Sequence, residues 1–135
     1  MIFCDASPLV AIIDRDDARH ADCHAALPLL STPLITTWAC LTEAMHIVGR
    51  KYGFQGQAVL WSLLERNIVA IHSHNATDWQ RMHHLMQQYQ NVPMDLADAS
   101  LVAAAESLNL TRIFTLDADF RIYRIKDKIP FEIVP

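Results

Sequence analysis

The sequence predicts an α/β fold, a three-layer α/β/α sandwich around a mainly parallel central sheet. Short runs rich in β-branched residues alternate with longer amphipathic stretches along the chain. Several of the short runs are apolar throughout, as expected of strands that are covered on both faces. The chain has 135 residues, with no repeat, linker or low-complexity tract. We therefore expect a single domain over residues 1–135.

The first half of the chain begins with the apolar run MIFC, which is expected to be a strand ending at Asp5. Ser7 and Pro8 then form a typical helix start, a cap followed by proline in the first turn. The elements expected next are a helix from about Asp17 to Leu30, a strand at 34–37, a helix capped by Thr37 that runs to Tyr52 and ends at Gly53, and a helix at 57–66.

The second half repeats the alternation. The elements expected there are a strand at 67–72, a helix that starts at Thr77 and Asp78, a helix from Asp95 to Leu108, a strand at 112–117, and a last strand at 131–134. Pro93 separates the two helices.

Composition narrows the class of protein. The chain is 52% hydrophobic and 19% charged, which is typical of a globular domain. No apolar run reaches the roughly 18 residues of a membrane span, and no basic segment precedes the first strand. The odd set Cys4, Cys23 and Cys40, without a CxxC pair, favours a reducing cytoplasm. A net charge of −4 argues mildly against a nucleic-acid partner.

Acidic residues follow the predicted strands or open the predicted helices. Asp5 and Asp117 end apolar strands, and parallel strands place their carboxyl ends at one edge of the sheet. Asp98 lies in the first turn of its helix and Glu43 early in another, so both are expected at that same edge. Four carboxylates are thus expected to converge at one pole of the molecule.

These acids have no basic neighbour in sequence. The segments DAS, TEA, ADAS and LDADF contain no lysine or arginine, and none occurs between Arg81 and Arg112. Crowded carboxylates either hold protons or recruit a cation, and oxygen ligands without cysteine or histidine suit Mg²⁺ or Mn²⁺. The alternative is structural, because a single Asp at a strand end is commonly a cap or turn residue.

Four segments together resemble PIN-domain nucleases, and most closely the VapC-type toxins of bacterial toxin–antitoxin pairs. The segments are MIFCDASPLVAII, WACLTEAMHIV, MDLADASLVAAAE and IFTLDADF, and the resemblance spans essentially the whole chain. It implies one PIN-like domain, an acidic site for Mg²⁺ or Mn²⁺, and hydrolysis of RNA phosphodiester bonds. It also implies a homodimer and inhibition by a partner antitoxin that occupies the acidic groove.

The resemblance assigns roles by position. It implies that the metal-binding and catalytic acids are Asp5, Glu43, Asp98 and Asp117. Ser7 and Thr115 match small hydroxyl residues that orient the carboxylates or a metal-bound water. Asp95 could replace or assist Asp98, and Asp119 could share the role of Asp117. Both are therefore candidates for supporting the site.

Basic residues offer contacts for RNA phosphates despite the acidic balance. The candidates are Arg50, Lys51, Arg121, Arg124, Lys126 and Lys128. The group near the C-terminus could equally be an ordinary solvated face.

Two other functions remain open. One is a catalytically silent PIN-like module that acts through protein contacts. The other is a haloacid-dehalogenase-like phosphatase, which would need DxDx[TV] after the first strand and a lysine near the site. The sequence has only Asp5-Ala6-Ser7 at that position and no suitable lysine.

Overall fold

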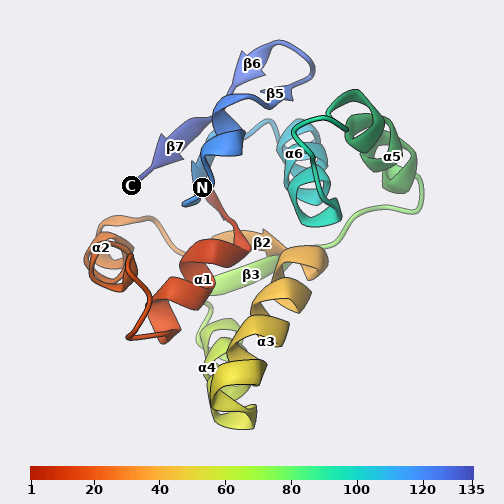
Figure 1. Cartoon of the computed structure of the whole chain (residues 1–135). Coiled ribbons are helices and arrows are strands. Elements are labelled where there is room, and N and C mark those ends of the chain that lie inside the picture. The colour runs from red at the N-terminus through yellow and green to blue at the C-terminus, as the bar shows by residue number, and fades with distance from the viewer.

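The computed structural model describes residues 1–135 and has a five-stranded parallel sheet. The sheet lies at the centre of the molecule (Figure 1). The strand order is β3-β2-β1-β4-β7. The strands are β1 (Ile2–Cys4), β2 (Leu34–Thr37), β3 (Val69–His72), β4 (Arg112–Phe114) and β7 (Glu132–Val134). All pairings in this sheet are parallel, so the predicted fold class is confirmed.

Helices fill the connections between these strands. They are α1 (Ala6–Ile13), α2 (His20–Ala26), α3 (Trp38–Tyr52), α4 (Phe54–Glu65), α5 (Asp78–Gln88) and α6 (Leu96–Leu108), with 3₁₀ turns η1 (Leu27–Leu29) and η2 (Ala118–Arg121). None of these helices has both the length and the hydrophobicity that a membrane span requires.

The strand order places the helices in two layers. The connections from β1 to β2 and from β2 to β3 advance in one direction, whereas the chain then crosses back to β4 and β7. Because such crossovers are right-handed, α1–α4 cover one face of the sheet and α5 and α6 the other, as Figure 1 shows. The direction reverses between the neighbouring strands β1 and β4, and the carboxyl ends at such a reversal are where ligands bind in open α/β sheets.

The core covers both faces of the central strands, with α1, α3 and α4 on one side and α6 on the other. All of β1 is buried, as are Ile113 and Phe114 in β4. On α6 the face that packs inward is built from small residues, among them Ala99, Ala103 and Ala104. Alanine lets the helix backbone approach its neighbours closely, so the acid on the first turn of α6 is brought near the ends of β1 and β4.

The expected starts of the first two helices were wrong. Ser7 does not cap α1, because the Asp5 carboxylate accepts a hydrogen bond from Ala6 N at 2.7 Å and the helix starts one residue before Ser7. The helix expected from Asp17 is shorter, since Asp17 accepts from Arg19 N in a turn that precedes α2. Pro28 lies in the 3₁₀ turn that follows α2.

The basic segment near the C-terminus contains a hairpin that the sequence did not indicate. β5 (Arg124–Ile125) pairs antiparallel with β6 (Ile129–Pro130). Lys126 and Asp127 between them have positive φ angles of 52° and 61°. Lys-Asp is not among the Asn-Gly or Asp-Gly pairs that mark such turns, which is why the hairpin was missed.

Candidate active site

Three aspartates converge at the carboxyl edge of the sheet. Asp5 follows β1, Asp117 follows β4 and Asp98 lies in the first turn of α6; one carboxylate oxygen from each lies within 4.8 Å of the others. The structure thus brings together three of the four acids singled out in the sequence, at the strand-order reversal between β1 and β4.

The Asp5 carboxylate is buried, with 5% of the residue exposed, and is held at both oxygens. Oδ1 accepts from Ala6 N at 2.7 Å, and Oδ2 accepts from the Thr115 hydroxyl at 2.8 Å. Burial raises the pKa of Asp5, and the nearby carboxylate of Asp117 raises it further, whereas the two hydrogen bonds oppose this rise. The geometry therefore fixes the carboxylate without supplying a positive charge.

Thr115 also organises Asp117. The Asp117 N–H donates to Thr115 Oγ1 at 3.0 Å, and the Asp117 carboxylate accepts from Asp119 N at 2.9 Å. The hydroxyl of Ser7 accepts from Leu116 N at 3.3 Å and ties the start of α1 to the same turn. Asp119 acts here through its backbone, and its carboxyl pKa is raised by burial and by Asp117.

Asp98 is held from two sides. Asp95, the N-cap of α6, accepts from Asp98 N at 2.8 Å, and Asp98 Oδ2 faces Asp95 N at 3.5 Å to complete a capping box. The fully buried Tyr123 donates its hydroxyl to Asp98 Oδ2 at 2.9 Å. Desolvation raises the pKa of Asp98 to about 7, which the Tyr123 hydrogen bond opposes and the neighbouring acids reinforce.

Glu43 lies at the rim of the cluster. It projects from α3 and lines a cavity of about 480 Å³ together with His46, Asp95 and Leu96. Partial burial raises its pKa, and the charges of Asp95, Asp5 and Asp117 raise it further. The charges of these three aspartates therefore affect Glu43, although Glu43 is not one of the residues whose carboxylate oxygens lie within 4.8 Å of one another.

No basic side chain neutralises the cluster. The ion pairs of the structure involve Asp14, Asp16, Asp22, Glu106, Asp127 and Glu132. None involves an acid at the carboxyl edge. Buried carboxylates without a cationic partner are costly, and a divalent cation with a preference for oxygen ligands would remove that cost. The donor set therefore fits Mg²⁺ or Mn²⁺.

Two further side chains, to which the motifs gave no role at the site, contact the cluster. Tyr123 is one, and its position in the segment FRIYRI carries no motif signal. Cys40 is the other: its thiol lies 4.0 Å from Asp5 Oδ1, and burial raises the pKa of the thiol to about 12. Both contacts join segments far apart in the sequence.

The basic candidates lie in different places. Arg121 lines a cavity beside Asp117, whereas Lys51 pairs with Asp14 and Asp16 at the far end of α3. Arg124 donates to main-chain carbonyls and Lys126 to Asn109. Arg50 lies in the last turn of α3, and Lys128 is exposed in the hairpin. Of the six, Arg121 is the one that borders the acid cluster.

The sequence matches the PIN domain family over residues 2–126. The chain belongs to the PIN domain family. A comparison with curated proteins finds no match. The structure of this PIN domain is similar to solved structures whose sequences are only distantly related to it.

One similar structure is Mycobacterium tuberculosis VapC20, described as a sarcin-ricin loop cleaving toxin. It has a TM-score of 0.81 and 17% identity, covering 88% of this chain and 92% of VapC20. Another is VapBC2 from Rickettsia felis bound to a DNA fragment from its promoter, with a TM-score of 0.63 and 18% identity, covering 98% of each chain. At these identities the likeness concerns the fold, which this PIN domain shares with both.

Proposed function

We propose that this PIN domain is a Mg²⁺- or Mn²⁺-dependent endoribonuclease and the toxin of a toxin–antitoxin pair. The observation that carries the proposal is the group of three aspartates at the carboxyl edge, which no lysine or arginine neutralises. Membership of the PIN family supports nuclease chemistry. The structurally similar VapC20 is described as a sarcin-ricin loop cleaving toxin, which supports RNA as the substrate.

The acids at the site and the residues that contact them would have different roles. Asp5, Asp98 and Asp117 would hold the cation, with Glu43 completing the set from the rim of the cluster. A bound divalent cation would polarise the phosphate and lower the pKa of a water that it binds. The Thr115 hydroxyl positions the Asp5 carboxylate and the Asp117 backbone relative to each other, and Tyr123 donates a hydrogen bond to one oxygen of Asp98. Asp98 Oδ1 has no hydrogen-bond partner within the chain, so it is free to bind the cation or accept a proton from water.

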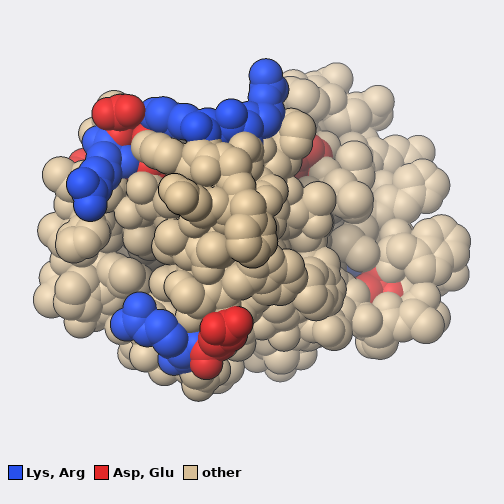
Figure 2. Space-filling view, turned by 90° about the horizontal axis from the view of Figure 1, so that it is seen from below, with Lys and Arg blue, Asp and Glu red and all other residues tan.

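An exposed apolar surface supports the proposed protein partners, an antitoxin and a second copy of this chain. Large apolar side chains on α3 and α4 are exposed: Trp38, Ile47, Tyr52, Phe54, Val59 and Trp61. Figure 2, seen from below, shows a largely uncharged face with charged groups at its margins. Exposed apolar area of this kind is typical of interaction sites. The three free and buried cysteines fit the cytoplasm as the proposed compartment.

The test is cleavage of single-stranded RNA by the purified chain, with Mn²⁺, with Mg²⁺ and with EDTA. We expect cleavage that depends on the metal and falls at least about a hundredfold in Asp98→Asn, the loss typical of removing one group that acts in the transition state. Glu65→Gln, which changes an exposed acid at the end of α4, is the matched control. A folded wild-type chain that binds Mn²⁺ and cleaves no RNA would favour the silent interaction module instead.

A further inference from the structure

We propose that the cavity between Arg19 and Arg121 binds a phosphate group of the RNA strand next to the cleavage site. This inference rests on the proposed ribonuclease function and adds a binding site to it. The cavity has a volume of about 240 Å³ and is bounded by Thr115 and Asp117 on the side of the acid cluster. Arg19 was not among the basic residues singled out in the sequence.

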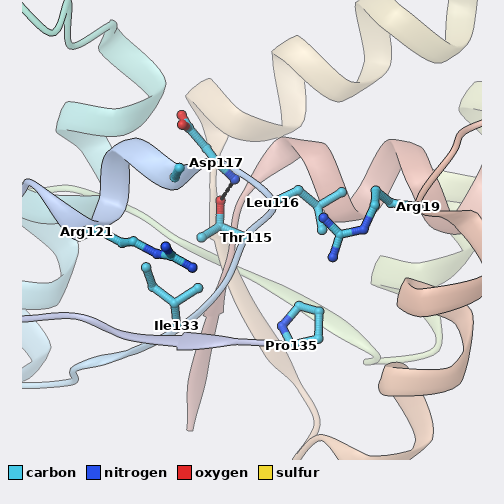
Figure 3. Close-up of a pocket in the computed structure, with 8 residues that line it drawn as sticks. Arg19, Thr115, Leu116, Asp117, Arg121, Ile133 and Pro135 are labelled. Carbon is cyan, nitrogen blue, oxygen red and sulfur yellow. Dashed lines mark hydrogen bonds between the residues drawn. The ribbon is translucent and has the colours of Figure 1, made fainter.

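The two guanidinium groups approach the cavity from opposite sides (Figure 3). Arg121 comes from η2, on the chain that follows β4, and Arg19 comes from the N-cap position of α2. Residues so far apart in sequence meet here because η2 and α2 both lie near the carboxyl end of β4 and the last strand. Ile133 of β7 lies below them in the same view.

Most hydrogen-bond donors of these arginines are free. Arg19 uses only Nε in an ion pair with Asp22, at 3.0 Å. The Arg121 side chain has neither an ion pair nor a hydrogen bond within the chain. Asp117 lines the same cavity but lies beyond 4.0 Å of both guanidiniums, since it forms no ion pair with them. Two cations held across one cavity repel each other, so an anion between them would be bound with charge-assisted hydrogen bonds.

The two guanidinium groups favour a phosphate, and the other walls carry nothing that would read a base. The side chains of Leu116, Ala118, Ile133 and Pro135 are apolar and offer no hydrogen bonds to base edges. An arginine fork matches the geometry of phosphate oxygens and does not depend on sequence. The position of the two arginines also matters for the electrostatics of the site. The four carboxylates at the carboxyl edge of the sheet repel an RNA backbone. Two guanidinium groups beside Asp117 would offset that repulsion where the RNA strand leaves the site.

The experiment measures binding without cleavage. The probe is a fluorescein-labelled ten-nucleotide single-stranded RNA, with either a 5′-hydroxyl or a 5′-phosphate, and EDTA is present throughout. Fluorescence anisotropy gives Kd for the wild type, Arg19→Ala, Arg121→Ala, the double variant and Arg66→Ala. Arg66 is the matched control, because it is exposed at the end of α4 and precedes β3 at the opposite edge of the sheet.

We expect the double variant to bind both RNAs roughly tenfold more weakly, and its salt dependence to become shallower by about 0.7 in log Kd against log salt for each arginine replaced. Arg66→Ala is expected to stay within about twofold of the wild type. Equal losses for the two RNAs identify an internal phosphodiester as the bound group. A loss confined to the 5′-phosphorylated RNA identifies a terminal phosphate.

Three results would overturn the inference: wild-type affinity in the double variant, an equal loss in Arg66→Ala, or no RNA binding by the wild type. Displacement of the RNA by a diglutamate peptide at lower concentration than by a dinucleoside phosphate would assign the cavity to an acidic protein segment instead. Cleavage is measured separately. Metal-dependent cleavage with unchanged binding in the variants rejects only the phosphate site, whereas arginine-dependent binding without cleavage rejects only the nuclease.

Discussion

Thr115 Oγ1 donates a hydrogen bond of 2.8 Å to Asp5 Oδ2, and so joins the ends of two neighbouring strands across 110 positions of sequence. The same oxygen accepts from Asp117 N at 3.0 Å. One hydroxyl group therefore sets the distance between two of the three clustered acids. The relationship depends on the parallel pairing of β1 with β4, which places Cys4 opposite Phe114 and the following residues side by side.

Thr115→Val should disturb the positions of the acids at the site without changing their number or charge. The substitution keeps the shape of the side chain and leaves Asp5 Oδ2 and Asp117 N without their partner. We expect a loss of about 1–3 kcal/mol in the free energy of unfolding, because both groups are buried or partly buried. We also expect Mn²⁺ affinity to fall roughly tenfold in calorimetric titration. Thr115→Ser is the control, because it keeps the hydroxyl group. If Thr115→Val kept its affinity for Mn²⁺ and Thr115→Ser lost it, the role assigned to the hydroxyl would be contradicted.

Tyr123→Phe should raise the pKa of Asp98 further. The Tyr123 hydrogen bond lowers this pKa against the effect of burial, so its removal leaves the charged form of Asp98 less stabilised. The acid limb of a rate–pH or Mn²⁺-affinity profile should therefore move to higher pH. Tyr52→Phe is the control, since Tyr52 bonds Asp14 away from the site. Equal profiles for Tyr123→Phe and the wild type would show that the contact does not tune the carboxyl.

The metal-free protein should lose stability as the pH rises. The pKa of Asp98 is about 7 in the folded chain, against about 3.9 for an unperturbed aspartate. Between these values the folded state holds more protons than the unfolded state, so the free energy of unfolding falls with increasing pH. Thermal denaturation in EDTA at pH 5 and pH 8 measures this. Asp98→Asn should flatten the dependence and be more stable than the wild type at pH 8.

Asp95→Asn is the comparison variant for this experiment. It keeps the oxygen that caps α6 but removes a charge that raises the pKa of Asp98, so we expect it to weaken the pH dependence without abolishing it. Complete loss of the pH dependence in Asp95→Asn would show that Asp98 is not the group that titrates.

Mn²⁺ affinity should increase with pH up to about 7 and then level off. Binding requires the charged form of Asp98, whose proton must leave before the cation can be held. Titration calorimetry in buffers of different ionisation enthalpy should detect the released proton below pH 7. An affinity that is constant from pH 5 to pH 8 would exclude Asp98 from the ligands.

Glu43→Gln should reduce metal affinity and activity less than Asp117→Asn. Glu43 stands at the rim, outside the group whose oxygens lie within 4.8 Å of one another. We expect roughly a tenfold loss of activity for Glu43→Gln and at least about a hundredfold loss for Asp117→Asn in RNA cleavage with Mn²⁺. The reverse order would place Glu43 among the inner ligands.

The sequence by itself determined the fold class and the edge at which the acids meet. Hydrophobic periodicity marks the strands and helices, and parallel strands place their carboxyl ends at one edge of the sheet. Asp5 and Asp117 could therefore be placed from pattern alone. Asp98 could be assigned to the first turn of its helix, because a buried alanine-rich stripe follows it.

Only the tertiary structure decided which side chains complete the site. Tyr123 reaches Asp98, Cys40 approaches Asp5, and Arg19 faces Arg121 through contacts between segments that no local pattern connects. The local caps were also settled there, since Asp5 rather than Ser7 starts α1. Periodicity reports which face of an element is buried. The partner that a buried or cavity-lining side chain meets depends on how distant elements pack, and that arrangement exists only in the folded chain.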